Sequence, residues 1–102
     1  MIDMLSQIEI PQEKIAELCR QFSVRELALF GSVLRDDFSA SSDVDLIVDF
    51  APDAQIGFMA FSKMQRELED LFNRPVDLVS KNGLNRRIRQ TILDEARVIY
   101  AA

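Results

Sequence analysis

The 102-residue sequence predicts an α/β domain, and two observations support that prediction. Segments with apolar residues at helical spacing are interspersed with short apolar runs of strand length. The order is helix, strand, strand, helix, strand, helix and a short final strand. The length suits one domain over residues 1–102 with a single core. Apolar residues at 48% and charged residues at 28% are typical of a globular chain and argue against disorder.

The first half of the chain predicts one helix and two strands. Residues 11–22 form an amphipathic helix, because Pro11 suits a first turn and the apolar residues recur at helical spacing. Those apolar residues are Ile15, Leu18, Cys19 and Phe22. The apolar runs 24–30 and 43–50 predict strands, and the polar stretch 31–42 predicts the loop between them.

The second half predicts a helix, a strand, a helix and a final strand. The helix over 56–72 follows from a helical apolar period: Ile56, Met59, Phe61, Met64, Leu68, Leu71 and Phe72. Residues 74–80 predict a strand, with Pro75 at its start, where a missing N–H is tolerated. Residues 84–96 predict a helix, and residues 97–101 predict a short strand.

Composition excludes several classes of protein. The absence of histidine removes His-based triads and His zinc sites, and the one cysteine, Cys19, excludes an internal disulfide. The net charge of −5 makes the chain a poor ligand for long nucleic acid. No apolar run is long enough to span a bilayer, and the N-terminus lacks signal-peptide features. We therefore expect a cytoplasmic protein without a membrane partner.

Two carboxylates stand at the start of the strand over 43–50. Residues two apart on a strand share a face, so Asp43 and Asp45 project together, opposite the apolar residues between and after them. Asp77 has the same setting in the strand 74–80. If these strands are neighbours, the three carboxylates converge and repel one another. A hard divalent cation such as Mg²⁺ relieves that repulsion, and two such ions can support phosphoryl chemistry.

Gly31 and Ser32 follow directly after the strand over 24–30. A glycine at a strand end lets the backbone approach a ligand closely. Backbone N–H groups and the Ser32 hydroxyl could then hold a phosphate. Carboxylates for a metal and donors for phosphate together predict a nucleoside triphosphate site. Two aspartates that only cap the start of a strand are the simpler alternative.

Gly-Ser, ten residues and then Asp-Val-Asp resemble the signature of the polymerase-beta-like nucleotidyltransferases. Arg35 after Ser32, the later Pro-Val-Asp-Leu-Val and the short chain are similar to the minimal nucleotidyltransferases, found as antitoxins beside a helical HEPN toxin. The resemblance implies a small mixed β-sheet flanked by helices and Mg²⁺-dependent transfer of a nucleotide. One departure is Asp36, which stands where many members have glycine.

The resemblance also implies roles for individual residues. Asp43 and Asp45 would bind two Mg²⁺ ions, and Asp77 would bind the ion that activates the acceptor. Gly31 and Ser32 would hold the β- and γ-phosphates of ATP or another triphosphate, and Arg35 would contact a phosphate or brace the loop. The expected acceptor is a tyrosine hydroxyl on the cognate HEPN toxin.

Two other functions remain open from the sequence. The chain could neutralise a toxin by contact alone, or it could modify a small molecule, although drug-modifying relatives usually carry a further helical domain. EF-hand, P-loop and Rossmann motifs have no support. Arg74, Lys81 and the basic run 86–89 either neutralise a triphosphate or form a solvated face. Asp49 suggests a structural role, and Cys19 suggests inert packing. The stripe Phe58, Met59, Phe61 and Met64 predicts core packing, with a partner groove as the alternative.

Overall fold

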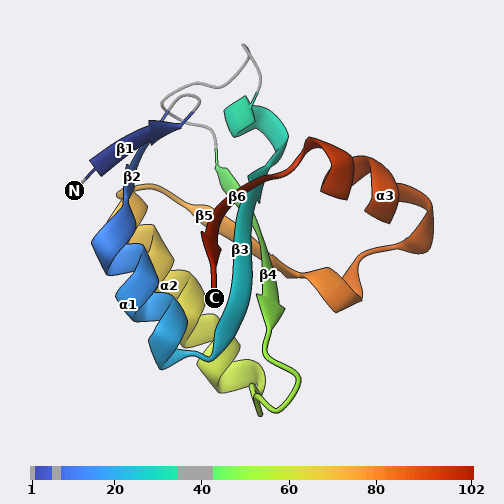
Figure 1. The fold of residues 1–102 in the computed structure, drawn as a ribbon, viewed down its shortest axis with the longest axis horizontal. Helices are drawn as coiled ribbons and strands as arrows, with labels where there is room; N and C mark the ends of the chain where they lie inside the picture. The colour runs from blue at the N-terminus through green and yellow to red at the C-terminus, as the bar shows by residue number, and fades with distance from the viewer. Residues whose placement is uncertain (1, 6–7, 35–42) are drawn as a thin grey trace.

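The computed structural model describes residues 2–5, 8–34 and 43–102. Within them, three helices surround a four-stranded sheet, and a two-stranded hairpin lies near the N-terminus (Figure 1). The strands are β1 Ile2–Leu5, β2 Ile8–Pro11, β3 Val24–Phe30, β4 Val44–Phe50, β5 Val76–Ser80 and β6 Arg97–Ala101. The α-helices are α1 Gln12–Gln21, α2 Phe58–Phe72 and α3 Arg86–Glu95, and the 3₁₀ turns are η1 Gly31–Leu34 and η2 Lys81–Gly83.

The four-stranded sheet is mixed and has the strand order β5-β4-β3-β6. β4 and β5 run parallel, whereas β3 is antiparallel to both β4 and β6. The predicted α/β class and mixed sheet are therefore confirmed, with element boundaries within two residues of those expected. The hairpin of β1 and β2 corrects the sequence analysis, which predicted no element before residue 11. Strands of four residues are too short to show a clear period.

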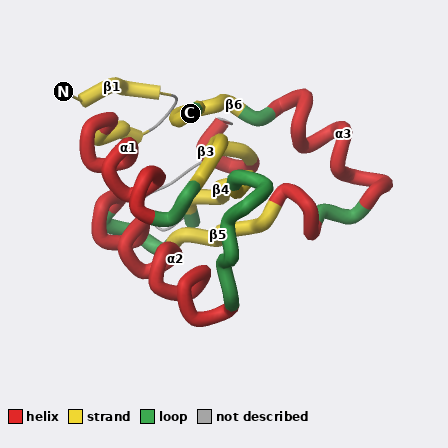
Figure 2. Tube along the Cα trace, turned by 60° about the horizontal axis from the view of Figure 1, so that its bottom comes forward, coloured by secondary structure: helices red, strands yellow, loops and turns green. Residues whose placement is uncertain are grey.

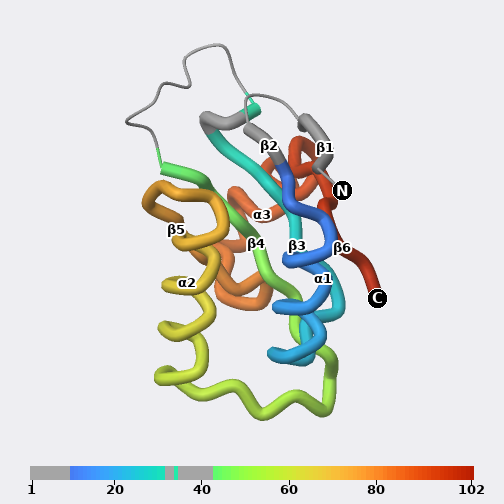
Figure 3. The backbone as a smooth tube through the Cα atoms, turned by 90° about the vertical axis from the view of Figure 1, so that its left-hand side faces the viewer, coloured from blue at the N-terminus to red at the C-terminus, as the bar shows by residue number. Residues whose placement is uncertain are grey.

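The helices lie on both sides of the four-stranded sheet (Figure 2). α1 and α2 pack side by side on one face, and α3 lies on the other side (Figure 3). Between the sheet and the first two helices lies the apolar core, which includes Ile15, Leu18, Leu27, Leu29, Leu46, Met64, Leu68 and Leu78. Of the helices in the described part of the chain, none combines the length and apolar composition needed to cross a bilayer.

β4 is buried on both faces of the sheet. Val44, Leu46 and Val48 are fully buried in the core, as the sequence predicts. Ile47 and Asp49 on the opposite face are also buried. A strand covered on both sides is expected to be apolar along its whole length. Asp49 and Asp45, which is half-buried near the start of the strand, are therefore exceptions that need another explanation.

Only part of the predicted apolar stripe on α2 faces the core. Met64 is fully buried and Phe61 packs partly against the core, but Phe58 and Met59 are each 84% exposed. At 3.6 residues per turn, Phe58 and Met59 lie more than a quarter turn around the helix from Met64. The prediction that all four side chains are core residues is wrong for these two.

Cys19 lies on the buried face of α1, as predicted. Its side chain has no exposed surface, and burial raises the pKa of its thiol to about 12. Because the thiolate is the reactive form, this cysteine is inert in the folded protein.

Candidate active site

Asp45 and Asp77 are neighbours on the parallel strands β4 and β5. The register pairs Asp45 with Asp77, next to the buried pair of Val44 and Val76. Strands in a sheet are about 4.8 Å apart, and paired residues project to the same face. The two carboxylates therefore leave the sheet side by side, with Asp77 exposed on the edge strand. The two strands are therefore neighbours, which is the condition under which the sequence analysis expects their carboxylates to converge.

Gly31 lies against the carboxylate of Asp45. Phe30 pairs with Asp45 across the antiparallel strands β3 and β4, and Gly31 is the next residue. Its φ of +77° lies in the region that favours glycine. A Cβ on Gly31 would lie 3.1 Å from Cγ of Asp45 and closer still to its Oδ2, an overlap that real side chains do not tolerate. Glycine alone allows the backbone to pass so near this carboxylate.

Asp43 lies at the same end of the sheet, one residue before β4, and its side chain is exposed. The following N–H, that of Val44, donates to the carbonyl oxygen of Pro75 at 2.9 Å. This hydrogen bond joins the first residue of β4 to the residue before β5. It therefore holds the backbone next to Asp43 close to the start of β5, which carries Asp77.

The backbone brings these aspartates to one end of the sheet, but it does not fix their side chains on a common point. Among the described residues, no group of three or more His, Cys, Asp or Glu side chains is arranged to hold a metal ion. Asp43 and Asp77 are exposed, and exposed side chains change rotamer on a picosecond to nanosecond timescale. Their orientation is thus adjustable, whereas their position along the sheet is not.

Two of the predicted phosphate-binding groups lie beyond what the structure describes. Ser32 follows Gly31 in η1, but only its backbone is described. Arg35 lies outside the described residues. The predicted roles of both groups in phosphate binding stay predictions.

Glu69 on α2 supports the start of β5, a contact that the sequence analysis missed. Its Oε2 accepts the backbone N–H of Val76 at 3.1 Å, and its carbonyl oxygen accepts the N–H of Arg74 at 3.3 Å. These two bonds hold the chain directly before Asp77. A glutamate on a charged helix carries no sequence signal for this role, because its partner is a backbone group seven residues away.

Asp49 has a structural role at the other end of β4. Arg25 donates to its Oδ2 from Nε at 3.1 Å and from Nη2 at 2.6 Å, and Nζ of Lys81 lies 4.0 Å from the same oxygen. Asp49 is four residues from Asp45, about 13 Å along a strand. Lys81 is therefore placed away from Gly31, which argues against the suggestion that it neutralises a triphosphate.

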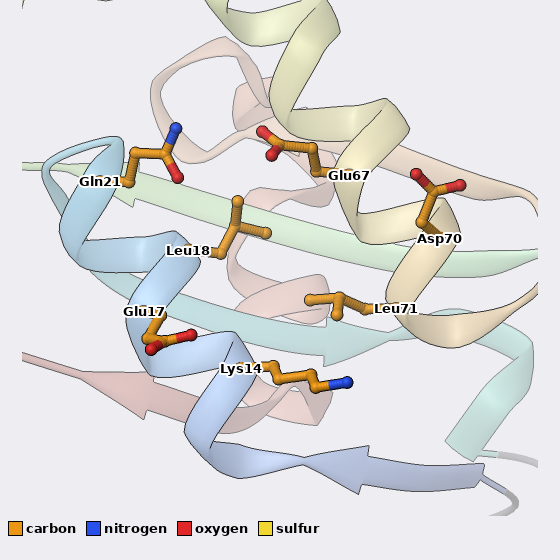
Figure 4. Close-up of a pocket in the computed structure, with 7 residues that line it drawn as sticks. All are labelled: Lys14, Glu17, Leu18, Gln21, Glu67, Asp70 and Leu71. Carbon is orange, nitrogen blue, oxygen red and sulfur yellow. The ribbon is translucent and has the colours of Figure 1, made fainter.

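A groove of about 320 Å³ lies between α1 and α2 (Figure 4). Glu17 and Glu67 line it from opposite helices, and Oε2 of Glu67 is buried without a hydrogen-bond partner in the described residues. Both helices cover the face of the sheet that carries Val44 and Leu46. The groove is thus separate from the end of the sheet where Asp45 and Asp77 lie.

Comparison with known families places this chain among the nucleotidyltransferases. Residues 12–99 match the family model described as a nucleotidyltransferase domain. A relative from Thermococcus cleftensis, the protein adenylyltransferase MntA, is 39% identical over 84 residues, which are 82% of this chain and 81% of that protein.

Solved structures share the fold. A structure described as a minimal nucleotidyltransferase has a TM-score of 0.71 and 32% identity, and the match covers 84% of this chain and 86% of that one. A tri-AMPylated Shewanella oneidensis HEPN toxin in complex with MNT antitoxin gives a TM-score of 0.64 at 20% identity, over 89% of this chain and 70% of that one. The second match shows similarity of fold alone.

Proposed function

The chain belongs to the nucleotidyltransferase domain family, and on this premise we propose that it transfers AMP from ATP to a hydroxyl of a partner protein. The partner that we propose is a HEPN toxin, the acceptor is a tyrosine, and the modification makes this chain an antitoxin. The relative named as a protein adenylyltransferase and the AMPylated toxin complex of similar fold support this choice of reaction. The in-register pair of Asp45 and Asp77, with Gly31 beside it, is the observation that carries the proposal.

The reaction needs one bond exchange at phosphorus. The acceptor oxygen bonds to the α-phosphorus of ATP, the bond from that phosphorus to the bridging oxygen breaks, and pyrophosphate leaves. The acceptor hydroxyl gives its proton to solvent water as the new bond forms. Positioning and electrostatic stabilisation supply most of the catalysis in such a transfer.

Asp43, Asp45 and Asp77 are the residues that we propose to hold Mg²⁺, as two ions. The donor set suits this metal, because carboxylate oxygens are its preferred protein ligands and the chain has no histidine. Two of the three side chains are exposed, so they can turn toward a common ion without moving the sheet. When bound, Mg²⁺ would neutralise phosphate charge and lower the pKa of the acceptor hydroxyl.

Gly31, Ser32 and Arg35 are the residues that we propose for the phosphates. The Gly31 backbone lies against the carboxylate of Asp45, so a phosphate bound by backbone N–H groups at this turn would lie next to a metal-binding carboxylate. A side chain at this position would displace that carboxylate. The Ser32 hydroxyl and the Arg35 guanidinium would add donors to the phosphate oxygens.

The position of Asp77 suits an acceptor on another protein. β5 is an edge strand of the sheet, and Asp77 is exposed on it. A tyrosine of a partner can therefore reach this carboxylate from solvent. The acceptor would then be supplied by the partner.

The test combines the purified protein, Mg²⁺, α-labelled ATP and a purified HEPN protein as the proposed partner. We expect label on the toxin, and we expect the double variant Asp45→Asn, Asp77→Asn to transfer none while still binding the toxin. Asp53→Asn removes an exposed carboxylate in the turn after β4 and should transfer label normally. A toxin that is bound but never labelled would favour neutralisation by contact alone, and activity retained in the double variant would refute the proposed site.

A further inference from the structure

A cavity of about 300 Å³ lies beside Gly31, and neither Asp45 nor Asp77 is among the described residues that line it. It is lined by Gly31 and Leu34 of η1, by Glu95 at the end of α3 and by Arg97 at the start of β6. The connection from α3 to β6 passes next to η1 at this end of the sheet (Figure 1). The cavity therefore shares Gly31 with the candidate active site but draws its charged side chains from the C-terminal elements.

The strand order sets this cavity in a row with the candidate active site. Asp77 on β5 pairs with Asp45 on β4. Phe30, directly before Gly31, pairs with Asp45, and Leu29 on β3 pairs with Arg97 on β6. β4 and β6 are two strand spacings apart, about 10 Å. Along this end of the sheet the residues thus change from Asp77 and Asp45, through the backbone of Gly31, to Arg97, and the cavity is where Arg97 and Gly31 share a surface.

Taking the proposed function as its premise, we propose that Arg97 binds the terminal phosphate of the nucleoside triphosphate. The α-phosphate would lie at the carboxylates with their metal, and the rest of the triphosphate would pass over Gly31 into the cavity. In the described part of the chain, Arg97 has no ion pair or side-chain hydrogen bond. Its five N–H donors are thus free to form a bidentate contact with phosphate oxygens.

Glu95 lies in the same cavity, and its removal should change the affinity for phosphate in the opposite direction to the removal of Arg97. Its carboxylate carries the same charge as a phosphate, and it is exposed in the same cavity as Arg97. If the cavity receives phosphate, removing the charge of Glu95 should strengthen binding, while removing that of Arg97 should weaken it. If the cavity does not receive phosphate, neither change should affect the affinity.

The experiment is calorimetric titration of the protein with Mg²⁺-ATP, inorganic triphosphate and AMP. For Arg97→Gln we expect about tenfold weaker binding of ATP and of inorganic triphosphate. AMP should bind unchanged, because it has no β- or γ-phosphate. Glu95→Gln should bind ATP about two- to fivefold more tightly. Arg97→Lys, which keeps the charge without the planar fork, should lie between Arg97→Gln and the wild type.

Arg66→Gln is the matched control, because Arg66 is an exposed arginine on α2, which packs on the face of the sheet away from α3. It loses the same charge and should bind ATP like the wild type. Wild-type ATP affinity in both Arg97→Gln and Glu95→Gln overturns this inference and leaves the proposed function intact. Should Arg97→Gln fail to fold, the ATP affinities of Glu95→Gln and Arg97→Lys test the inference instead. Tighter binding by Glu95→Gln and weaker binding by Arg97→Lys support it, and wild-type affinity in both overturns it. A wild-type protein that binds no Mg²⁺-ATP overturns both proposals.

Discussion

The backbone of Gly31 lies closer to the carboxylate of Asp45 than any residue with a side chain could come. Two independent features produce this contact. The antiparallel register places Phe30 opposite Asp45, and the positive φ of Gly31 turns the chain at that point. The junction between β3 and η1 is therefore specific for glycine, both in its backbone conformation and in the space around it.

Gly31→Ala should lower the free energy of unfolding by about 2 kcal/mol or more. Alanine is strained at a positive φ, and its Cβ would displace the carboxylate of Asp45. Equilibrium unfolding in urea measures the change. Gly83→Ala is the matched control, since a Cβ there would meet only Ser80 at 4.0 Å, and its effect should stay within about 0.5 kcal/mol. Equal stability of the two variants would contradict the close packing at Gly31.

Mg²⁺-ATP should stabilise the wild type through Asp45 and Asp77. A ligand at about ten times its Kd adds about 1.4 kcal/mol, which raises the Tm of a domain of this size by several degrees. The double variant Asp45→Asn, Asp77→Asn should show a much smaller rise, and Asp53→Asn should show the full one. In EDTA the double variant should melt above the wild type, because it lacks like charges at one end of the sheet. Scanning fluorimetry with and without Mg²⁺-ATP measures these shifts.

The same measurement can refute the metal site. An undiminished shift in the double variant, together with a lower Tm in EDTA, would mean that Asp45 and Asp77 only cap their strands.

Removing either partner of the ion pair between Arg25 and Asp49 should lower the free energy of unfolding, but by different amounts. Arg25→Gln leaves a buried carboxylate with only Lys81 at 4.0 Å, whereas Asp49→Asn leaves a guanidinium that is half exposed to water. We expect a loss of about 2 kcal/mol for Arg25→Gln and about 1 kcal/mol for Asp49→Asn. Urea unfolding of both variants and of the double variant gives the coupling. A larger loss for Asp49→Asn would contradict this account, and transfer activity should be unchanged in both.

Stability should fall at alkaline pH partly because of Cys19. Its pKa is raised from 9.0 to about 12 in the folded state, so the unfolded chain releases the thiol proton first as the pH rises. Between pH 9 and 12 the folded state binds more protons, and the free energy of unfolding therefore declines. Cys19→Ala should decline less over pH 8.5–10.5 than the wild type, measured by urea unfolding. If the free energy of unfolding falls equally with pH in both proteins, Cys19 does not contribute to the loss of stability.

The sequence by itself determined the type and order of the elements from α1 to β6, because the periodicity of apolar residues is a local property. It also indicated candidate residues for the chemistry. Gly31, Asp45 and Asp77 stand out because each departs from its surroundings, a glycine at the end of an apolar run and carboxylates between apolar residues of predicted strands. The resemblance to the nucleotidyltransferases rested on these residues, and the family comparison confirms it.

Only the tertiary structure decided which strands are neighbours and in what register. The pairing of Asp45 with Asp77 and the contact of Gly31 with Asp45 depend on residues far apart in the sequence. The same holds for Glu69, which acts on the backbone of β5, and for Arg97, which the last strand brings beside η1. Local propensity cannot encode such contacts, because strand register is set by packing of the whole sheet against its helices.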